Sequence, residues 1–408
     1  MPNGVWKMRK RVGTIAAVIA ACSTVAACGS SSSSSPGSSS AAGSSSAPAA
    51  TTSGSGASST SSAVTKAQAT VAALYKGTDR SLPTSGPKAQ TGKKVWVVSC
   101  YEGAVGCSVP AQGFVAASAH LGWKTTVVDA KLDPSTATQE IKSAVAAKAD
   151  AIVLDGFPCS WAPGAIASAK SAGVKIYGLL SFDCSGKALD DGQLLFGKET
   201  YQQYLEDQAG AGIAAYIIDK TNGKGNVLSM QYNDGGAVNA IGQGIENGIK
   251  HGCPDCTFSS FAVTGQNIVQ NQLQTVTSAA LTKDPSANVV TSPIDSAILL
   301  GMGAAVTQAK AGGRHILLTG VEGFAPNLKL IAAGGPDNFA IGSAALWEGW
   351  AAADGLNRVF AGASQVDAGI GLQAIDKSHP SPSGTGNYNG NKRSAGYEQN
   401  YIRIWTGK

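Results

Sequence analysis

From residue 93 onward, short apolar runs alternate with longer amphipathic stretches, and this alternation limits the possible folds most strongly. Residues 95–99 are rich in β-branched side chains and predict a strand, whereas residues 111–121 predict a helix that ends at Gly122. Nearly continuous apolar strands are typical of parallel sheets covered by helices on both faces. Strands that alternate with helices form right-handed βαβ crossovers. The sequence therefore predicts an α/β protein with doubly wound parallel sheets.

The alternation falls into two series, separated by an irregular passage at residues 183–196. The first series predicts strands at 95–99, 125–129, 151–154 and 174–180, and helices at 111–121, 135–148 and 161–172. Asp133 and Pro134 suit the N-cap and first position of the second helix. The second series predicts strands at 226–230, 258–263, 288–291, 316–319 and 339–343, and helices at 199–218, 237–250, 268–281, 297–309, 327–333 and 347–360. Two series imply two lobes, and ligands bind outside the carboxyl ends of such strands, so we expect a cleft between the lobes.

The N-terminus has the organisation of an export signal. Four basic residues lie in the first eleven, and the uncharged stretch 12–21 is too short to span a bilayer comfortably. The sequence Val-Ala-Ala-Cys-Gly at 25–29 resembles the bacterial lipobox, which predicts a signal peptide at 1–28 and lipidation of Cys28. Cys22 also fits the pattern, but low-complexity sequence begins directly after Cys28. An ordinary secretory signal is the alternative.

Residues 29–62 are almost entirely Ser, Gly, Ala, Thr and Pro. Such a composition cannot form a core, so we expect a disordered tether with a reach of roughly 30 Å.

The composition of the rest of the chain excludes several function classes. Four of the 31 Lys and Arg residues lie in the signal, so the rest of the chain has 27 basic residues against 26 Asp and Glu. This near-neutral balance gives no reason to expect nucleic-acid binding. The sequence holds no Gly-x-Ser-x-Gly elbow and no phosphate-binding loop of the Walker type. The four histidines are scattered, so neither a metal site nor a cofactor nor an enzymatic activity is predicted.

Of the eight cysteines, Cys22 and Cys28 lie in the signal, and six follow it. An even number in an exported protein indicates disulfides, although six cysteines allow fifteen pairings. We expect the sequential set Cys100–Cys107, Cys159–Cys184 and Cys253–Cys256. The last pair also has the spacing of a redox motif or half a zinc site, but no second cysteine pair or histidine set accompanies it.

Several segments, in their order and spacing, resemble the type I periplasmic binding proteins, in particular the ribose-binding-like receptors of sugar transporters. The segments are Gly-Lys-Lys-Val-Trp-Val-Val at 92–98, Ala-His-Leu-Gly-Trp at 119–123, Ala-Asp-Ala-Ile-Val-Leu at 149–154, Ala-Gly-Val-Lys-Ile at 172–176 and Thr-Gly-Val-Glu-Gly at 319–323. The resemblance covers about residues 93–376 and implies two lobes that close on a ligand and present it to an ABC permease.

The resemblance also implies lobe boundaries. The N-lobe is expected at 93–187 with about 345–372, and the C-lobe at 188–344 with about 373–408. Three hinge crossings are expected near 184–196, 343–346 and 371–377.

Carried over position by position, the resemblance implies a set of ligand-binding residues. They are Tyr101, Glu102, Phe157, Trp161, Asn239, Asp295, Glu322 and Trp347. Trp161 and Trp347 could equally pack in a core, and Asp295 could cap a helix. Several expected basic and amide groups are missing, since Pro158 and Cys159 stand where an acidic and a basic residue are usual and Asn239 stands where an arginine is expected. A sugar or polyol is favoured, with a less hydroxylated or aromatic molecule as the alternative.

Together these features predict a monomeric, lipid-anchored solute-binding protein on the extracytoplasmic face of a bacterial cell membrane. Its expected partners are a small-molecule ligand, the permease of an ABC importer and the membrane that holds the anchor. A sensor that signals to a membrane kinase is the alternative, because the same fold serves both roles.

Overall fold

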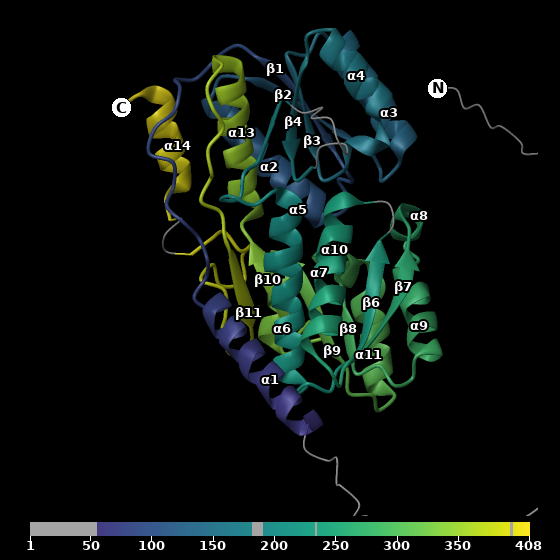
Figure 1. Ribbon diagram of the computed structural model, residues 1–408. Helices are drawn as coiled ribbons and strands as arrows, with labels where there is room; N and C mark the ends of the chain where they lie inside the picture. Colours follow the sequence, from purple (N-terminus) through teal and green to yellow (C-terminus); the bar gives the residue numbers. More distant parts are fainter. Residues whose placement is uncertain (1–54, 182–190, 233–234, 392–394) are drawn as a thin grey trace, which may run out of the picture. The chain divides into compact units, whose positions relative to one another are not determined.

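Two mainly parallel β-sheets form the framework of the protein (Figure 1), in a computed structural model that describes residues 55–181, 191–232, 235–391 and 395–408. The expected signal peptide, its Cys28 and Cys184 lie outside the described residues. The chain divides into the unit Met1–Thr51 and the unit Thr52–Lys408, and the second unit contains both sheets. None of the described helices is both long enough and apolar enough to span a membrane.

The N-lobe sheet has the strand order β2-β1-β3-β4-β5, with every pair parallel. Its strands are β1 (Lys94–Ser99), β2 (Lys124–Asp129), β3 (Ala151–Asp155), β4 (Lys175–Leu179) and β5 (Gly192–Gln193). The helices of this lobe are α2 (Val105–His120), α3 (Pro134–Ala146), the short 3₁₀ turn η1 (Cys159–Trp161), α4 (Pro163–Ser171) and α13 (Ala345–Ala361). Asp133 caps α3 as predicted, since its carboxylate accepts the N–H of Thr136 at 2.8 Å.

The C-lobe sheet has the order β11-β10-β9-β8-β6-β7, and only β10 and β11 pair antiparallel. Its strands are β6 (Asn226–Tyr232), β7 (Thr257–Val263), β8 (Val289–Thr291), β9 (Leu317–Glu322), β10 (Phe339–Ser343) and β11 (Leu372–Asp376). Its helices are α1 (Ser55–Leu74), α5 (Tyr201–Gln203), η2 (Tyr204–Gly210), α6 (Ala211–Lys220), α7 (Gly236–Gly252), α8 (Gly265–Val269), α9 (Leu273–Lys283), α10 (Asp295–Ala297), η3 (Ile298–Met302), α11 (Gly303–Ala311) and α12 (Ala325–Ala333). The doubly wound α/β fold predicted from the sequence is therefore confirmed.

The structure differs from the expected tether at its C-terminal end. Helix α1 begins at Ser55, so residues 55–62 are helical and not part of a disordered segment. Ala67, Val71 and Leu74 follow one another at intervals of four and three residues and are buried where α1 packs on α6. Because most side chains of this segment are small, its apolar stripe can be recognised only from the packing of α1 on α6.

The lobe boundaries also differ from the expected ones. Strand β5 keeps residues 192–193 in the N-lobe sheet instead of the C-lobe. Strand β11, at 372–376, lies in the C-lobe sheet, where residues from about 373 onward were expected. Helix α14 (Tyr397–Thr406) packs on α13 of the N-lobe instead of belonging to the C-lobe, because Trp405 stacks on Trp350 with ring centroids 5.8 Å apart. The segment 75–92 adds a connection that the sequence did not predict, since it joins α1 of the C-lobe to β1 of the N-lobe.

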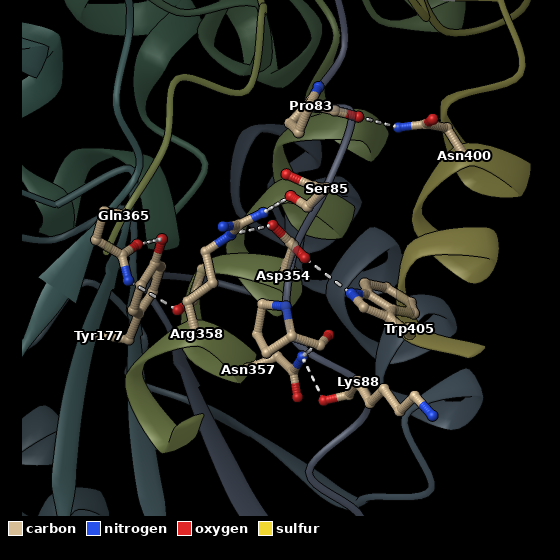
Figure 2. Close-up of polar contacts among 12 residues, drawn as sticks. Pro83, Ser85, Lys88, Tyr177, Asp354, Asn357, Arg358, Gln365, Asn400 and Trp405 are labelled. Atoms are coloured by element: carbon tan, nitrogen blue, oxygen red, sulfur yellow. Dashed lines mark hydrogen bonds and ion pairs between the residues drawn. The ribbon is translucent and has the colours of Figure 1, made fainter. Parts of the chain in front are cut away.

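Helix α13 clamps this N-terminal connection against the C-terminal helix. Figure 2 shows the Arg358 guanidinium between Asp354 and the backbone of the connection, where it donates to Asp354 Oδ2 and to Ser85 O at 2.7 Å each. Trp405 of α14 donates its indole N–H to the other oxygen of Asp354 at 2.8 Å. Asn357 accepts the N–H of Gln90 at 2.8 Å, so several side chains on α13 bind the same connection.

Two of the three sequential disulfides lie within the described residues. Cys100 is bonded to Cys107 and Cys253 to Cys256, in accordance with the sequential pairing. The first bond fastens the end of β1 to the first turn of α2. This first turn begins at Val105, six residues before the predicted start, and Pro110 lies inside the helix. The predicted start at residue 111 is therefore wrong. It lies directly after Pro110, and proline is normally found in the first turn of a helix rather than inside it.

We predict that Arg358→Met lowers the free energy of unfolding by about 3–5 kcal/mol, because it leaves the buried Asp354 carboxylate without its cation. Denaturant unfolding measures the change. Arg403→Met is the matched control, because Arg403 is exposed on α14, and we expect it to change the free energy by no more than about 0.5 kcal/mol. Equal effects of the two substitutions would show that the buried pair contributes no special stability.

Candidate ligand-binding cleft

A cavity of about 110 Å³ lies between the lobes, where the carboxyl ends of the two sheets face each other. This volume is several times the roughly 10–15 Å³ that one water molecule requires. Residues from both lobes line it, most of them apolar. They include Cys100, Gly106, Leu132, Gly156, Trp161, Leu180, Tyr201, Tyr204, Leu205, Tyr232, Val238, Ile241, Ile268, Ile294, Ser296, Val321, Glu322, Ser343 and Glu348. The cavity occupies the position at which the fold predicts a ligand.

The lobes touch each other beside this cavity at the N-terminus of α2. Helix α2 has no side-chain cap from its own N-cap residue, Ala104. The backbone N–H of Gly106 instead donates to Ser296 Oγ of the C-lobe at 3.1 Å. A Cβ atom at Gly106 would lie 2.9 Å from Glu322 Oε1, so the absence of a side chain there lets the carboxyl group approach the helix. The C-lobe thus caps a helix of the N-lobe.

Asp295 positions Glu322 rather than lining the cavity itself. Its buried carboxylate accepts three backbone N–H groups of the β9–α12 loop, those of Val321 at 3.0 Å, Gly323 at 2.9 Å and Phe324 at 3.1 Å. Glu322 has a φ of 77°, a conformation that is strained for a residue with a side chain. Its Oε2 accepts the N–H of Asp295 at 3.0 Å. The loop is therefore fixed in a strained form that directs the Glu322 carboxyl group toward the cleft.

The cleft also holds acidic groups from the N-lobe. Glu348, in the first turn of α13, is buried and accepts the hydroxyl hydrogen of Ser343. Asp155, at the end of β3, is 0% exposed and lies next to Gly156 of the cavity lining without lining the cavity itself. Burial raises the pKa of Glu348 to about 7, and burial together with the charges of Glu102 and Glu348 raises the pKa of Asp155 well above its usual range.

Burial also raises the pKa of the Glu322 carboxyl group well above its usual range, and the neighbouring charge of Asp295 adds to the effect. No lysine, arginine or histidine lines the cavity in the part of the chain that the structure describes. The nearby Arg80 guanidinium is bound by both carboxylate oxygens of Asp367, at 2.8 Å each. The described residues contain no group of three or more side chains suited to bind a metal ion.

Aromatic rings form one wall of the cavity. Tyr201 and Tyr204 both stack on Phe196, with ring centroids 4.9 and 4.3 Å away. They belong to a long helical segment that was predicted as one regular helix at 199–218, but residues 204–210 are a π-helix. Such π-helical turns frequently occur at functional sites, because they shift the side chains that follow. Here the irregular turn brings Tyr204 and Leu205 to the cavity together.

The structure brings only part of the predicted set to the cavity. Trp161 and Glu322 line it. Tyr101 is half-buried and packs against the apolar clusters of both lobes, whereas the Glu102 side chain is exposed. The remaining predicted residues lie elsewhere: Phe157 and Trp347 are buried in cores, Asn239 is exposed on α7, and Asp295 is bound to backbone.

The sequence reasoning missed Tyr201, Tyr204, Tyr232, Ser296, Ser343 and Glu348. Two signals were available. Tyr201 and Tyr204 lie three apart at the start of the first C-lobe helix and thus share one face. Glu348 is an acidic residue in the otherwise apolar first turn that follows a hinge crossing.

The fold and its interlobe cavity define a two-lobed receptor of the kind that encloses small molecules. Residues 96–364 match the family model described as the periplasmic binding protein domain. The match covers more than half of the 408 residues, and the chain belongs to this family. The family consists of solute-binding proteins and not of enzymes. No curated protein sequence matches the chain significantly.

Solved structures share the fold at low sequence identity. An ABC sugar transporter subunit from Rhodobacter sphaeroides has a TM-score of 0.58 and 18% identity, over 71% of this chain and 99% of the other. An ABC transporter solute-binding protein from Agrobacterium vitis with bound allitol gives 0.58 and 20%, over 70% and 96%. The binding protein of the arabinose ABC transporter from Shewanella, bound to L-arabinofuranose, gives 0.58 and 17%, over 75% and 95%.

We predict that Glu348→Gln makes the stability of the ligand-free protein less dependent on pH. The pKa of Glu348 rises from 4.5 to about 7 on folding, so its contribution is fully present below pH 4.5 and is lost as the pH rises toward 7. At about 1.36 kcal/mol per pKa unit, the loss is roughly 3 kcal/mol, and the substitution removes it.

Denaturant unfolding between pH 4.5 and 8 measures this effect, since the pKa of Glu348 rises from 4.5 to about 7 within that window. Asp155 and Glu322 interact electrostatically with Glu348 and keep their own pH dependence in both proteins. Glu398→Gln, on the exposed face of α14, is the control and should leave the pH profile unchanged. A profile that Glu348→Gln also leaves unchanged would mean that Glu348 is not buried as a carboxyl group in solution.

Proposed function

We propose that the protein is the receptor of an ABC importer, which captures a small organic molecule between its lobes and delivers it to the membrane permease. The interlobe cavity carries this proposal, because it is enclosed by both lobes and lined by residues from each of them. The capping of α2 by Ser296 gives closure a defined contact. A closed receptor differs in surface from an open one, and a permease can recognise that difference.

A sugar or polyol ligand has support from the solved neighbours, which were crystallised with allitol, L-arabinofuranose and myo-inositol. The cavity offers carboxyl oxygens of Glu322 and Glu348 as acceptors for hydroxyl groups and aromatic rings as flat surfaces for a ring of carbon atoms. These features suit a compact ligand with an apolar face.

The lipobox-like sequence supports a lipid anchor at Cys28, which places the receptor on the extracytoplasmic face of the membrane. Residues 29–54 then separate the anchor from α1, and α1 leads directly into the connection held by α13. The structured part works as a monomer in this proposal, because both walls of the cavity come from one chain.

We predict that Cys28→Ser moves the protein from the membrane fraction to the soluble extracytoplasmic fraction, because the serine hydroxyl is not acylated. Fractionation of cells expressing each form, with metabolic labelling by a fatty acid, measures the change. Cys22→Ser is the matched control and should leave the protein in the membrane. The reverse result would move the anchor to Cys22.

We predict that Gly106→Val weakens ligand binding at least about tenfold while the unliganded protein keeps its stability. The added side chain meets Glu322 Oε1 at 2.9 Å and Ser296 Oγ at 3.4 Å, and in this proposal the two lobes make that contact on closure. A thermal-shift screen of allitol, L-arabinose, myo-inositol and small amines first selects a molecule that binds. Isothermal titration with that molecule then measures the change in affinity.

Gly164→Val is the matched control, because Gly164 occupies the same second position of a helix and has no atom within 4 Å of a built Cβ. It should leave binding unchanged. Equal affinities of the two variants would mean that the lobes do not close as described, and a screen in which no small molecule binds would reject the receptor function.

A further inference from the structure

The cleft has an unusual balance of charge for a site that encloses its ligand. Glu322 of the C-lobe and Glu348 of the N-lobe both line the cavity. The charge of Glu348 acts on Glu322 and also on Asp155, which is buried next to the lining residue Gly156. Among the described residues that line the cavity, none carries a positive charge. The protein therefore brings acidic groups together without supplying their counter-charge.

The other buried acids near the cleft are satisfied by the protein, which distinguishes them from this set. Asp295 accepts three backbone N–H groups. Asp337 accepts the side-chain amide of Asn327 at 3.2 Å and the N–H of Phe339 at 3.4 Å. Among the described residues, Glu348 by contrast has only the Ser343 hydroxyl as a hydrogen-bond partner, and Glu322 has only the N–H of Asp295. An ionised carboxylate buried in this way is unfavourable unless a cation or a proton compensates for it.

The remaining lining suits the other part of such a ligand. Tyr201 and Tyr204 present aromatic rings, and rings attract an ammonium group held within about 6 Å of their centres. The aliphatic side chains, among them Leu205 and Ile241, suit a carbon skeleton. The lining holds five hydroxyl groups, those of Ser296, Ser343, Tyr201, Tyr204 and Tyr232; Ser343 donates its hydrogen to Glu348, and Ser296 accepts the N–H of Gly106.

We propose that the ligand is a small organic cation, a protonated amine whose ammonium group lies between the carboxyl groups of Glu322 and Glu348 and against the tyrosine wall. This inference rests on the proposed receptor function and narrows its ligand class. A neutral sugar or polyol would leave the acidic groups uncompensated, whereas an amino sugar or a simple alkylamine would pair with them.

The test compares pairs of molecules of nearly equal shape that differ in one positive charge. Suitable pairs are glucosamine with glucose, 4-aminobutanol with butanediol, and choline with its uncharged carbon analogue dimethylbutanol. Thermal shift and isothermal titration are run on the whole chain without its signal peptide, at millimolar concentrations of each probe. We expect an amine to bind about thirtyfold or more tightly than its neutral partner.

Isosteric substitutions then locate the charge. Glu348→Gln and Glu322→Gln each keep the shape of the side chain and should weaken the amine about thirtyfold or more, with little effect on a neutral molecule. Glu398→Gln, exposed on α14, should change neither. The melting temperature of each unliganded variant shows whether it is folded.

The outcomes separate this inference from the receptor function. If a neutral member binds as tightly as its amine, the cationic ligand is wrong and the receptor function stands. If no amine binds at millimolar concentration while allitol, L-arabinose or myo-inositol does, the result is the same. If the amines bind but neither glutamine variant weakens them, the ammonium site is wrong. If nothing binds, both proposals fail.

Discussion

The buried ion pair between Arg358 and Asp354 is the interaction on which the arrangement of the chain depends. Both residues lie on α13. This helix packs so closely on α2 that a side chain at Gly349 would collide with the backbone of α2. Arg358 also binds the backbone of the N-terminal connection, and Asp354 binds Trp405 of the C-terminal helix. Helix α13 therefore holds two parts of the chain on the N-lobe. One is the connection that follows α1, and the other is the last helix, α14. Because α1 packs on the C-lobe, movements of the lobes have to be accommodated by the residues between α1 and this clamp.

The alternation of apolar strands and amphipathic helices was sufficient to predict both sheets, because buried parallel strands need long apolar runs wherever they occur. The errors fall where a segment is stabilised by distant partners. Helix α1 has a composition that is typical of a tether, and its Ala67–Val71–Leu74 stripe is meaningful only against α6. Helix α14 was assigned to the C-lobe from its position in the chain, but the stacking of Trp405 on Trp350 holds it on the N-lobe.

The candidate site was less predictable than the fold, for a physical reason. Position-by-position resemblance identifies the loops that reach the cleft, and two of the residues it implied, Trp161 and Glu322, line the cavity. Whether a side chain within such a loop turns toward the cavity depends on local contacts. Phe157 stacks on Trp161 and thereby enters the N-lobe core, and Asp295 turns toward the backbone of the next loop. Tyr204 reaches the cavity together with its neighbour Leu205 from a π-helical turn, and the regular helix predicted at 199–218 did not indicate such a turn.

Under the proposed function, the acidic groups that define the cleft also govern its closure. In an open receptor, Glu322 and Glu348 face water, and their charges are stabilised by hydration. Closure removes this water, and the raised pKa of each group records the resulting penalty. An empty cleft therefore resists closing while its carboxyl groups remain ionised, and a ligand that supplies a positive charge removes the resistance. The ligand shifts the equilibrium by the difference between its affinities for the two forms, so the same uncompensated charges that select the ligand also make closure depend on it.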